Sequence, residues 1–190
     1  MAGTCSTCHR TSMTEGPVPD PGDGKVVGAV DSTKEALMLS LDAQRAHVLG
    51  SLEGLDDASL RRPMLPTHWS CIGLVHHLAL DVERFWFGQT VAGAPADEPG
   101  DGRSAWAVDP ATPPAEILAL YRHEIERADA IIEATPLEAA PRHWADHFGS
   151  WRLPDLRAII LHVITETACH AGHLDAAREL IDGSTWLILE

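Results

Sequence analysis

The sequence predicts an all-α protein with the architecture of a four-helix bundle. Four segments of roughly 20–28 residues carry apolar side chains at helical spacing, and proline, glycine or capping residues bound each of them. The sequence contains no convincing run of the alternation that β-strands show, and no internal repeat. Long helices joined by loops in this way are typical of a four-helix bundle.

The first helix is expected within residues 31–55. Asp31 and Ser32 both favour helix N-caps, and Glu35 lies three residues beyond Ser32, as in a capping box. Apolar side chains then fall near one face of this helix, at Leu37, Leu41, Val48 and Leu52.

The second helix is expected over residues 71–93, after a break that contains Pro63 and Pro66. Ser70 can cap the start of this helix, and Gly93 ends it. A polar loop rich in Gly, Pro and Asp follows and leads to the third helix.

The third helix is expected over residues 115–135, with Pro113 and Pro114 at its start and Pro136 after its end. Its apolar positions again follow helical spacing, at Ile117, Leu120, Ile125, Ala128 and Ile132.

The fourth and longest helix is expected over residues 156–182. An irregular aromatic loop at residues 142–151 precedes it, Pro154 and Asp155 lead into it, and Gly183 stops it.

The composition is that of one folded domain. A chain of 190 residues with 45% hydrophobic residues can build a single substantial core. We expect this domain at residues 31–190, after a flexible tail at residues 1–30.

No stretch approaches the roughly 20 apolar residues of a membrane span, and the N-terminus lacks the pattern of a secretion signal, so a cytoplasmic protein is expected. The net charge of −14 argues against binding to nucleic acid or to an anionic membrane. A homodimer is compatible with these features.

The four cysteines are too few and too unevenly spread for a disulfide scaffold. Cys5, Cys8 and His9 form the motif CSTCH, which matches a c-type haem attachment motif or half of a zinc site. No export signal accompanies the haem motif, and no second CxxC pair completes a zinc site. Because the surrounding segment is rich in Gly, Pro, Ser and Thr, we interpret it as part of the tail.

The last helix carries a polar stripe on an otherwise largely apolar surface. The stripe consists of His162, Glu166, His170 and His173. A solvated helix face usually carries Lys, Arg and Glu, whereas three histidines with one glutamate have the composition of a metal site. The alternative interpretation is a solvated helix face.

The spacing of the stripe limits which side chains can share one ion. His162 and His173 lie about 16 Å apart along the helix axis, so they cannot both bind one metal. Two neighbouring members of the stripe can bind the same ion, and a third ligand is then expected from another helix. His76 and His77 on the second helix are the natural donors, and Asp81, one turn after His77, can orient that ring.

Residues 73–87 and 161–183 together resemble the DinB/YfiT-like superfamily of metal-binding four-helix bundles. Residues 53–66 are similar to the same superfamily, so the resemblance extends over about residues 35–183. The similarity is greatest to its actinobacterial branch of mycothiol-dependent enzymes, which includes mycothiol S-transferases and the N-terminal domain of a maleylpyruvate isomerase.

The resemblance implies one divalent metal ion, zinc in the first place, with nickel or another ion as an alternative. Its expected ligands are His77, Glu166 and His170, because the mycothiol-dependent isomerase uses a Glu-x-x-x-His pair on its last helix. His173 is expected to be either an alternate ligand or a group that faces the substrate. His162 is a further alternate ligand.

Three protein ligands leave an open coordination position, as in catalytic zinc sites. The resemblance implies that a small thiol such as mycothiol is activated there for attack on an electrophilic small molecule. A metal-dependent hydrolase and a thiol-dependent isomerase are the alternatives. A further alternative is a non-catalytic, metal-stabilised stress or interaction protein, in which His162 or His173 closes the site. Cys169 is expected to be a packed thiol and not a nucleophile.

Arg84 is a candidate anchor for an anionic group of the substrate or cofactor, with a surface arginine as the alternative. Four tryptophans are candidates for the pocket wall, with core packing as the alternative, which is favoured for Trp86. They are Trp69, Trp86, Trp144 and Trp151.

Overall fold

The computed structural model describes residues 32–95 and 105–186, and the expected tail at residues 1–30, with its CSTCH motif, lies outside them. The described residues are all-α, as predicted. The elements in chain order are α1 (Ser32–Gly50), α2 (Asp57–Arg61), α3 (Cys71–His77), the π-helix η1 (Leu78–Val91), α4 (Pro114–Ala134), the 3₁₀ helix η2 (Asp146–Phe148) and α5 (Leu156–Asp182).

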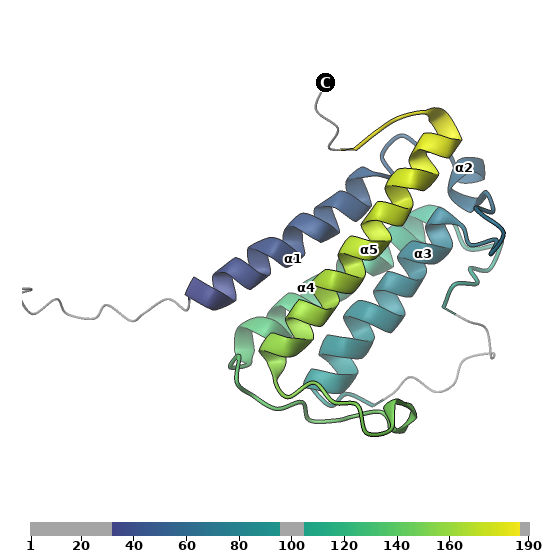
Figure 1. Cartoon of the computed structure of the whole chain (residues 1–190). Coiled ribbons are helices and arrows are strands. Elements are labelled where there is room, and N and C mark those ends of the chain that lie inside the picture. Colours follow the sequence, from purple (N-terminus) through teal and green to yellow (C-terminus); the bar gives the residue numbers. More distant parts are fainter. Residues whose placement is uncertain (1–31, 96–104, 187–190) are drawn as a thin grey trace, which may run out of the picture. The chain divides into compact units, whose positions relative to one another are not determined.

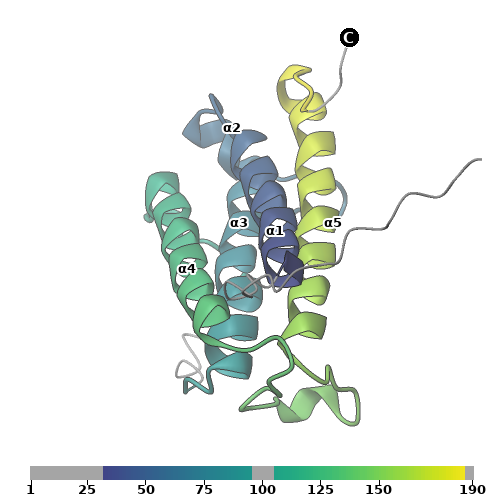
Figure 2. The same cartoon turned by 90° about the vertical axis from the view of Figure 1, so that its left-hand side faces the viewer.

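Four long helices form the bundle within residues 32–186. Helix α3 continues directly into η1, so the two act as one long helix beside α1, α4 and α5. Helix α1 packs against α5, and α4 packs against α3 and η1. Helix η1 also contacts α5, which brings the second and the last predicted helices together. The four helices lie side by side in both views (Figures 1 and 2).

The predicted starts of α3 and α5 and the predicted end of α5 are confirmed, and each has a capping residue. The Oγ of Ser70 accepts a hydrogen bond from the backbone N–H of Gly73 at 3.1 Å, and Asp155 accepts one from Ala158 at 2.9 Å. Gly183 ends α5 with φ of 78°, in the left-handed region that glycine adopts without strain. These caps fix where α3 and α5 begin, and therefore the register of the side chains that face each other across them.

Two features of the helices differ from the prediction. The first helix ends at Gly50, and the segment after it forms the separate short helix α2, which Asp56 caps. The second helix is α-helical only as far as His77; from Leu78 it has the wider hydrogen bonding of a π-helix, as in the bond from Ala92 N–H to the Phe87 carbonyl at 3.0 Å. The sequence pattern did not distinguish the two helix types. Such π-helical turns are frequent at functional sites.

The core contains the apolar residues predicted from helical spacing. The fully or nearly fully buried ones among them are Leu41, Val48, Leu52, Ile117, Ala128 and Ile132. An ion pair that the apolar spacing does not predict crosses this core. Arg45 of α1 donates from Nε and Nη2 to the two carboxylate oxygens of Glu83 on η1, at 2.8 and 2.7 Å, and both side chains are buried. The pair ties α1 to η1.

Candidate metal centre

Three metal-capable side chains converge where the α3–η1 helix meets α5. His77 is the last residue of α3, and Glu166 and His170 lie one turn apart on α5. Residues four apart on an α-helix lie on the same face, so Glu166 and His170 both face His77. One ligand atom from each of the three residues lies within 4.8 Å of those of the other two.

His77 presents one ring nitrogen to this group. Its Nδ1–H donates a hydrogen bond to Oδ2 of Asp81 at 2.8 Å, as expected for an orienting carboxylate. Its Nε2 is buried, lacks a hydrogen-bond partner, and lies 3.9 Å from Oε1 of Glu166. In a neutral imidazole with its proton on Nδ1, Nε2 has a free lone pair.

His170 shows the same feature. Its Nδ1 is buried and has no hydrogen-bond partner. A buried polar atom without a partner is costly, on the order of 1–3 kcal/mol. Two such nitrogens beside a carboxylate match the donor set of a divalent metal ion such as zinc, which would satisfy both of them.

The electrostatic state of the group suits a cation. Burial, with the neighbouring His77 adding to it, lowers the pKa of His170 to about 4. Burial acts to raise the pKa of Glu166, but the contact with His162 and the charges of the nearby histidines outweigh it, so the pKa lies below its ordinary value. At neutral pH, His170 is therefore neutral and Glu166 is anionic, which are the forms that bind metal.

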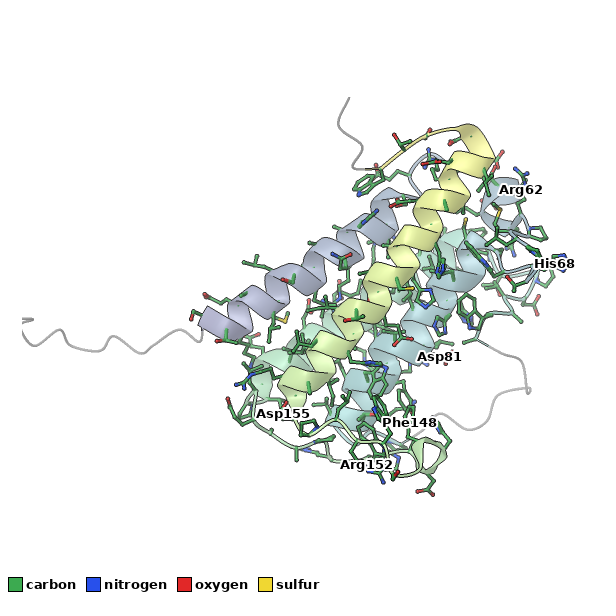
Figure 3. All side chains as sticks on the ribbon, viewed as in Figure 1. Arg62, His68, Asp81, Phe148, Arg152 and Asp155 are labelled. Carbon is green, nitrogen blue, oxygen red and sulfur yellow. The ribbon has the colours of Figure 1, made fainter. Side chains whose placement is uncertain are left out.

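A cavity of about 530 Å³ opens beside the three side chains. Helix η1, the loop that contains η2, and α5 contribute its walls; in Figure 3, Asp81 lies on η1 and Phe148 in that loop. Its lining residues are His77, Asp81, Phe85, Trp86, His147, Phe148, His162, Thr165, Glu166, Cys169 and His170. A volume of this size is typical of a small-molecule site.

Trp106 covers the histidines and was not identified from the sequence. Its ring stacks on His77 with centroids 4.2 Å apart and planes at 18°, and it meets His170 edge-on at 5.6 Å. The backbone of this loop lies directly on α3, where a Cβ at Gly73 would be 2.5 Å from the Trp106 carbonyl oxygen. A glycine inside a helix often marks such a close approach, so Gly73 was the available signal.

His76 has a different role from the one considered. Its Nδ1–H donates to the carbonyl oxygen of Ala105 at 2.6 Å, so it holds the loop that carries Trp106. Of the two adjacent histidines, only His77 joins the group of three.

The remaining members of the stripe lie beside the group. His162 lies 3.3 Å from Oε2 of Glu166 through its Nε2, and its ring packs edge-on against Trp86. His173 is exposed, with its ring 5.6 Å from that of His170 and 6.2 Å from that of Trp69.

Arg84 pairs with another part of the bundle. Its Nη2 donates to Oε1 of the buried Glu124 on α4 at 2.7 Å, and Arg84 does not line the cavity.

The tryptophans divide between two places. Trp86 is buried in the core and also lines the cavity. Trp144 and Trp151 pack behind it, with ring centroids 5.9 and 6.1 Å from that of Trp86. Trp69 lies elsewhere, in a separate cavity of about 360 Å³ that Trp106 also lines.

The expectation that Cys169 is packed is wrong. Its side chain is exposed and lines the cavity. Cys71 is the buried cysteine among the described residues, and burial raises the pKa of its thiol to about 11.

The sequence profile of the mycothiol-S-transferase family matches residues 36–183, more than three quarters of the chain. The match agrees with the resemblance drawn from the motifs on the second and last helices. No curated protein and no solved structure matches the chain.

Within the described ranges, no helix combines the length and apolar character needed to cross a membrane.

Proposed function

The chain belongs to the mycothiol S-transferase family, and from this membership we propose that it joins a low-molecular-weight thiol, mycothiol, to an electrophilic small molecule with the help of a divalent metal ion. The observation that carries the proposal is the group of His77, Glu166 and His170 at the wall of a cavity large enough for a small molecule. Zinc is the first candidate for the ion, and nickel is the alternative.

In this proposal, His77, Glu166 and His170 hold the ion, and Asp81 fixes the ring of His77. When bound, a divalent ion lowers the pKa of a coordinated thiol, so that a thiolate is available at neutral pH. The aromatic side chains of the cavity hold the electrophile and limit access of water.

The proposed reaction is a substitution that needs no external oxidant or reductant. The thiol sulfur forms a bond to the electrophilic carbon, and the bond from that carbon to its leaving group breaks. The leaving group departs with the electron pair, and the thiol proton passes to water. The attacking sulfur belongs to the cosubstrate, so the exposed Cys169 is not required.

A metal-dependent hydrolase is the second candidate, and one observation favours it. Two histidines and one glutamate are also the ligand set of zinc peptidases, in which a metal-activated water is the nucleophile. Family membership supports thiol transfer over hydrolysis and over a thiol-dependent isomerisation. A purely structural site would need a fourth protein ligand, and His162 and His173 lie outside the group of three.

The test begins with metal analysis of protein purified without a histidine tag. A conjugation assay with mycothiol and a generic alkylating electrophile follows, with and without a chelator. We expect about one metal ion per chain and turnover that needs both metal and thiol. Cys169→Ser should remain active, whereas His170→Ala should lose metal and activity together.

Three results would overturn the proposal. Turnover of an ester or amide without added thiol, after exhaustive dialysis, would favour the hydrolase. Loss of transfer in Cys169→Ser, with its metal retained, would require a protein nucleophile. A metal-loaded protein that is inert with every thiol and electrophile would favour a structural role.

A further inference from the structure

The charges and rings around the cavity point to the class of its electrophile. We propose that this cavity accepts uncharged or cationic aromatic electrophiles and discriminates against anionic ones. The inference rests on the proposed function, because it names the second substrate of the same site. It is carried by the residues that line the cavity.

The lining contains two carboxylates and four histidines, and neither lysine nor arginine. Of the eleven described residues that line the cavity, Asp81 and Glu166 carry carboxylates and none is Lys or Arg. A divalent ion held by the group of three would be balanced in charge by these two carboxylates. The ion and these two carboxylates would together have no net positive charge to offer an anion, and the chain has a net charge of −14.

Two arginines of the surrounding elements are engaged elsewhere. Arg84 on η1 pairs with the buried Glu124. Arg152, in the loop before α5, donates to the carbonyl oxygens of Gly149 and Trp151 and lies over the Trp144 ring, 5.3 Å from its centroid. Bidentate pairing with arginine is the usual way to hold a carboxylate or phosphate, and neither of these two arginines lines the cavity.

The apolar wall of the cavity is aromatic and firmly held. Trp86 is only 4% exposed, and it stacks on Phe148 with centroids 5.5 Å apart and planes at 24°. Phe85 meets Trp86 edge-on at 5.1 Å, and His162 meets it edge-on at 4.6 Å. Aromatic ligands gain stacking and edge-to-face contacts on such a wall, and a cationic group is attracted to the ring faces.

The first test is a kinetic comparison of three benzyl chlorides with mycothiol: the unsubstituted compound, its 4-sulfonate and its 4-aminomethyl derivative. A sulfonate is used because it is a poor metal ligand. Each kcat/KM is divided by the uncatalysed rate with the same thiol, which removes differences in intrinsic reactivity. We expect the value for the sulfonate to be lower by about tenfold or more. Equal values for the three compounds would overturn the inference.

A charge introduced into the cavity provides a matched variant. Thr165 of α5 lines the cavity, is exposed, and donates its hydroxyl hydrogen bond to the Leu161 carbonyl oxygen of its own helix. Thr165→Lys should raise the ratio of sulfonate to unsubstituted turnover severalfold, and Thr165→Gln, of similar length without charge, should leave that ratio unchanged. Because each ratio is taken within one variant, a general loss of activity cancels. Equal ratios in the two variants would contradict the inference.

An equilibrium measurement separates this inference from the proposed function. Calorimetric titration of the zinc-loaded chain uses 2-naphthylmethanol, 2-naphthylmethylammonium and naphthalene-2-sulfonate. Tighter binding of the first two, without any thiol transfer, would support the substrate class while the transferase proposal fails. Thiol transfer with equal binding of all three would overturn the substrate class and leave the transferase proposal in place.

Discussion

The Nδ1–H of His77 donates to Oδ2 of Asp81 over 2.8 Å, and the opposite ring nitrogen, Nε2, lies 3.9 Å from Oε1 of Glu166. The aspartate therefore decides which nitrogen of the imidazole carries the proton. It also fixes the orientation of the ring toward α5. Asp81 acts on the proposed metal through His77 and is a positioning residue.

Replacing Asp81 tests this relationship. Asp81→Ala should weaken zinc binding by roughly 10–100-fold, because His77 loses its orienting acceptor. Asp81→Asn should lose less zinc affinity, since the amide oxygen of the asparagine can still accept the hydrogen bond from Nδ1–H of His77. The dissociation constants are measured by competition with a chromophoric chelator. Wild-type affinity in Asp81→Ala would show that the hydrogen bond has no influence on the metal.

The assignment of the three ligands makes a separate prediction. His77→Ala, Glu166→Ala and His170→Ala should each lose most of the bound metal, because one of the three donors is removed. His173→Ala should retain it, since this exposed ring lies outside the group. Metal content is measured after gel filtration, with circular dichroism as the control for folding. A metal-free His173→Ala protein would make His173 a ligand.

The contact between Gly73 and Trp106 predicts a substitution that acts on the site from a distance. In Gly73→Ala, the new Cβ would lie 2.5 Å from the Trp106 carbonyl oxygen, so the loop must move and the stacking of Trp106 on His77 is lost. We expect weaker metal binding and a change in tryptophan fluorescence.

Gly172 on α5 provides the control for that substitution. A Cβ there meets no atom within 4 Å, and the position is exposed and helical. Gly172→Ala should therefore stabilise the fold by about 0.5–1 kcal/mol and leave zinc affinity unchanged. Similar zinc affinities in Gly73→Ala and Gly172→Ala would show that Trp106 does not support the site.

The helices and the polar stripe on α5 could be predicted because they depend on local patterns. Apolar spacing and caps such as Ser70 and Asp155 determine where helices begin, and the four-residue spacing of Glu166 and His170 places them on one face. The choice of His77, Glu166 and His170 came from resemblance to a family, because spacing alone left both His76 and His77, and more than one pair on α5, as candidates.

The contacts that could not be predicted join segments distant in the sequence. Trp106 reaches His77 through a loop whose path has no periodicity, and Arg84 on η1 pairs with Glu124 on α4. The exposure of Cys169 depends on which strip of α5 the neighbouring helices leave uncovered. None of these features has a signature within a short stretch of sequence.

The buried ion pair between Arg45 and Glu83 predicts a large effect on stability. Arg45→Met leaves the Glu83 carboxylate buried without its partner, which should cost about 3–5 kcal/mol in the free energy of unfolding. The double variant Arg45→Met/Glu83→Leu should recover much of this loss, because an apolar pair of similar volume replaces the two charges. Urea denaturation measures the free energy of unfolding of the single and the double variant. A double variant no more stable than Arg45→Met would contradict this explanation.

The buried thiol of Cys71 predicts how stability changes at alkaline pH. Burial raises the pKa of this thiol from its ordinary 9.0 to about 11, so as the pH rises the unfolded chain releases the proton before the folded chain does. The contribution of Cys71 to stability is therefore complete below pH 9.0 and decreases as the pH rises toward 11. Urea denaturation of the wild type and of Cys71→Ala between pH 8 and 11 should show a steeper loss in the wild type, whatever cost the smaller side chain adds at every pH.

The burial of Cys71 also predicts how the two described cysteines react with a thiol reagent. In a Cys5→Ser/Cys8→Ser background, the reagent at pH 8 should modify the exposed Cys169 quickly and Cys71 only on unfolding. Rapid modification of both thiols in the folded protein would contradict the burial of Cys71.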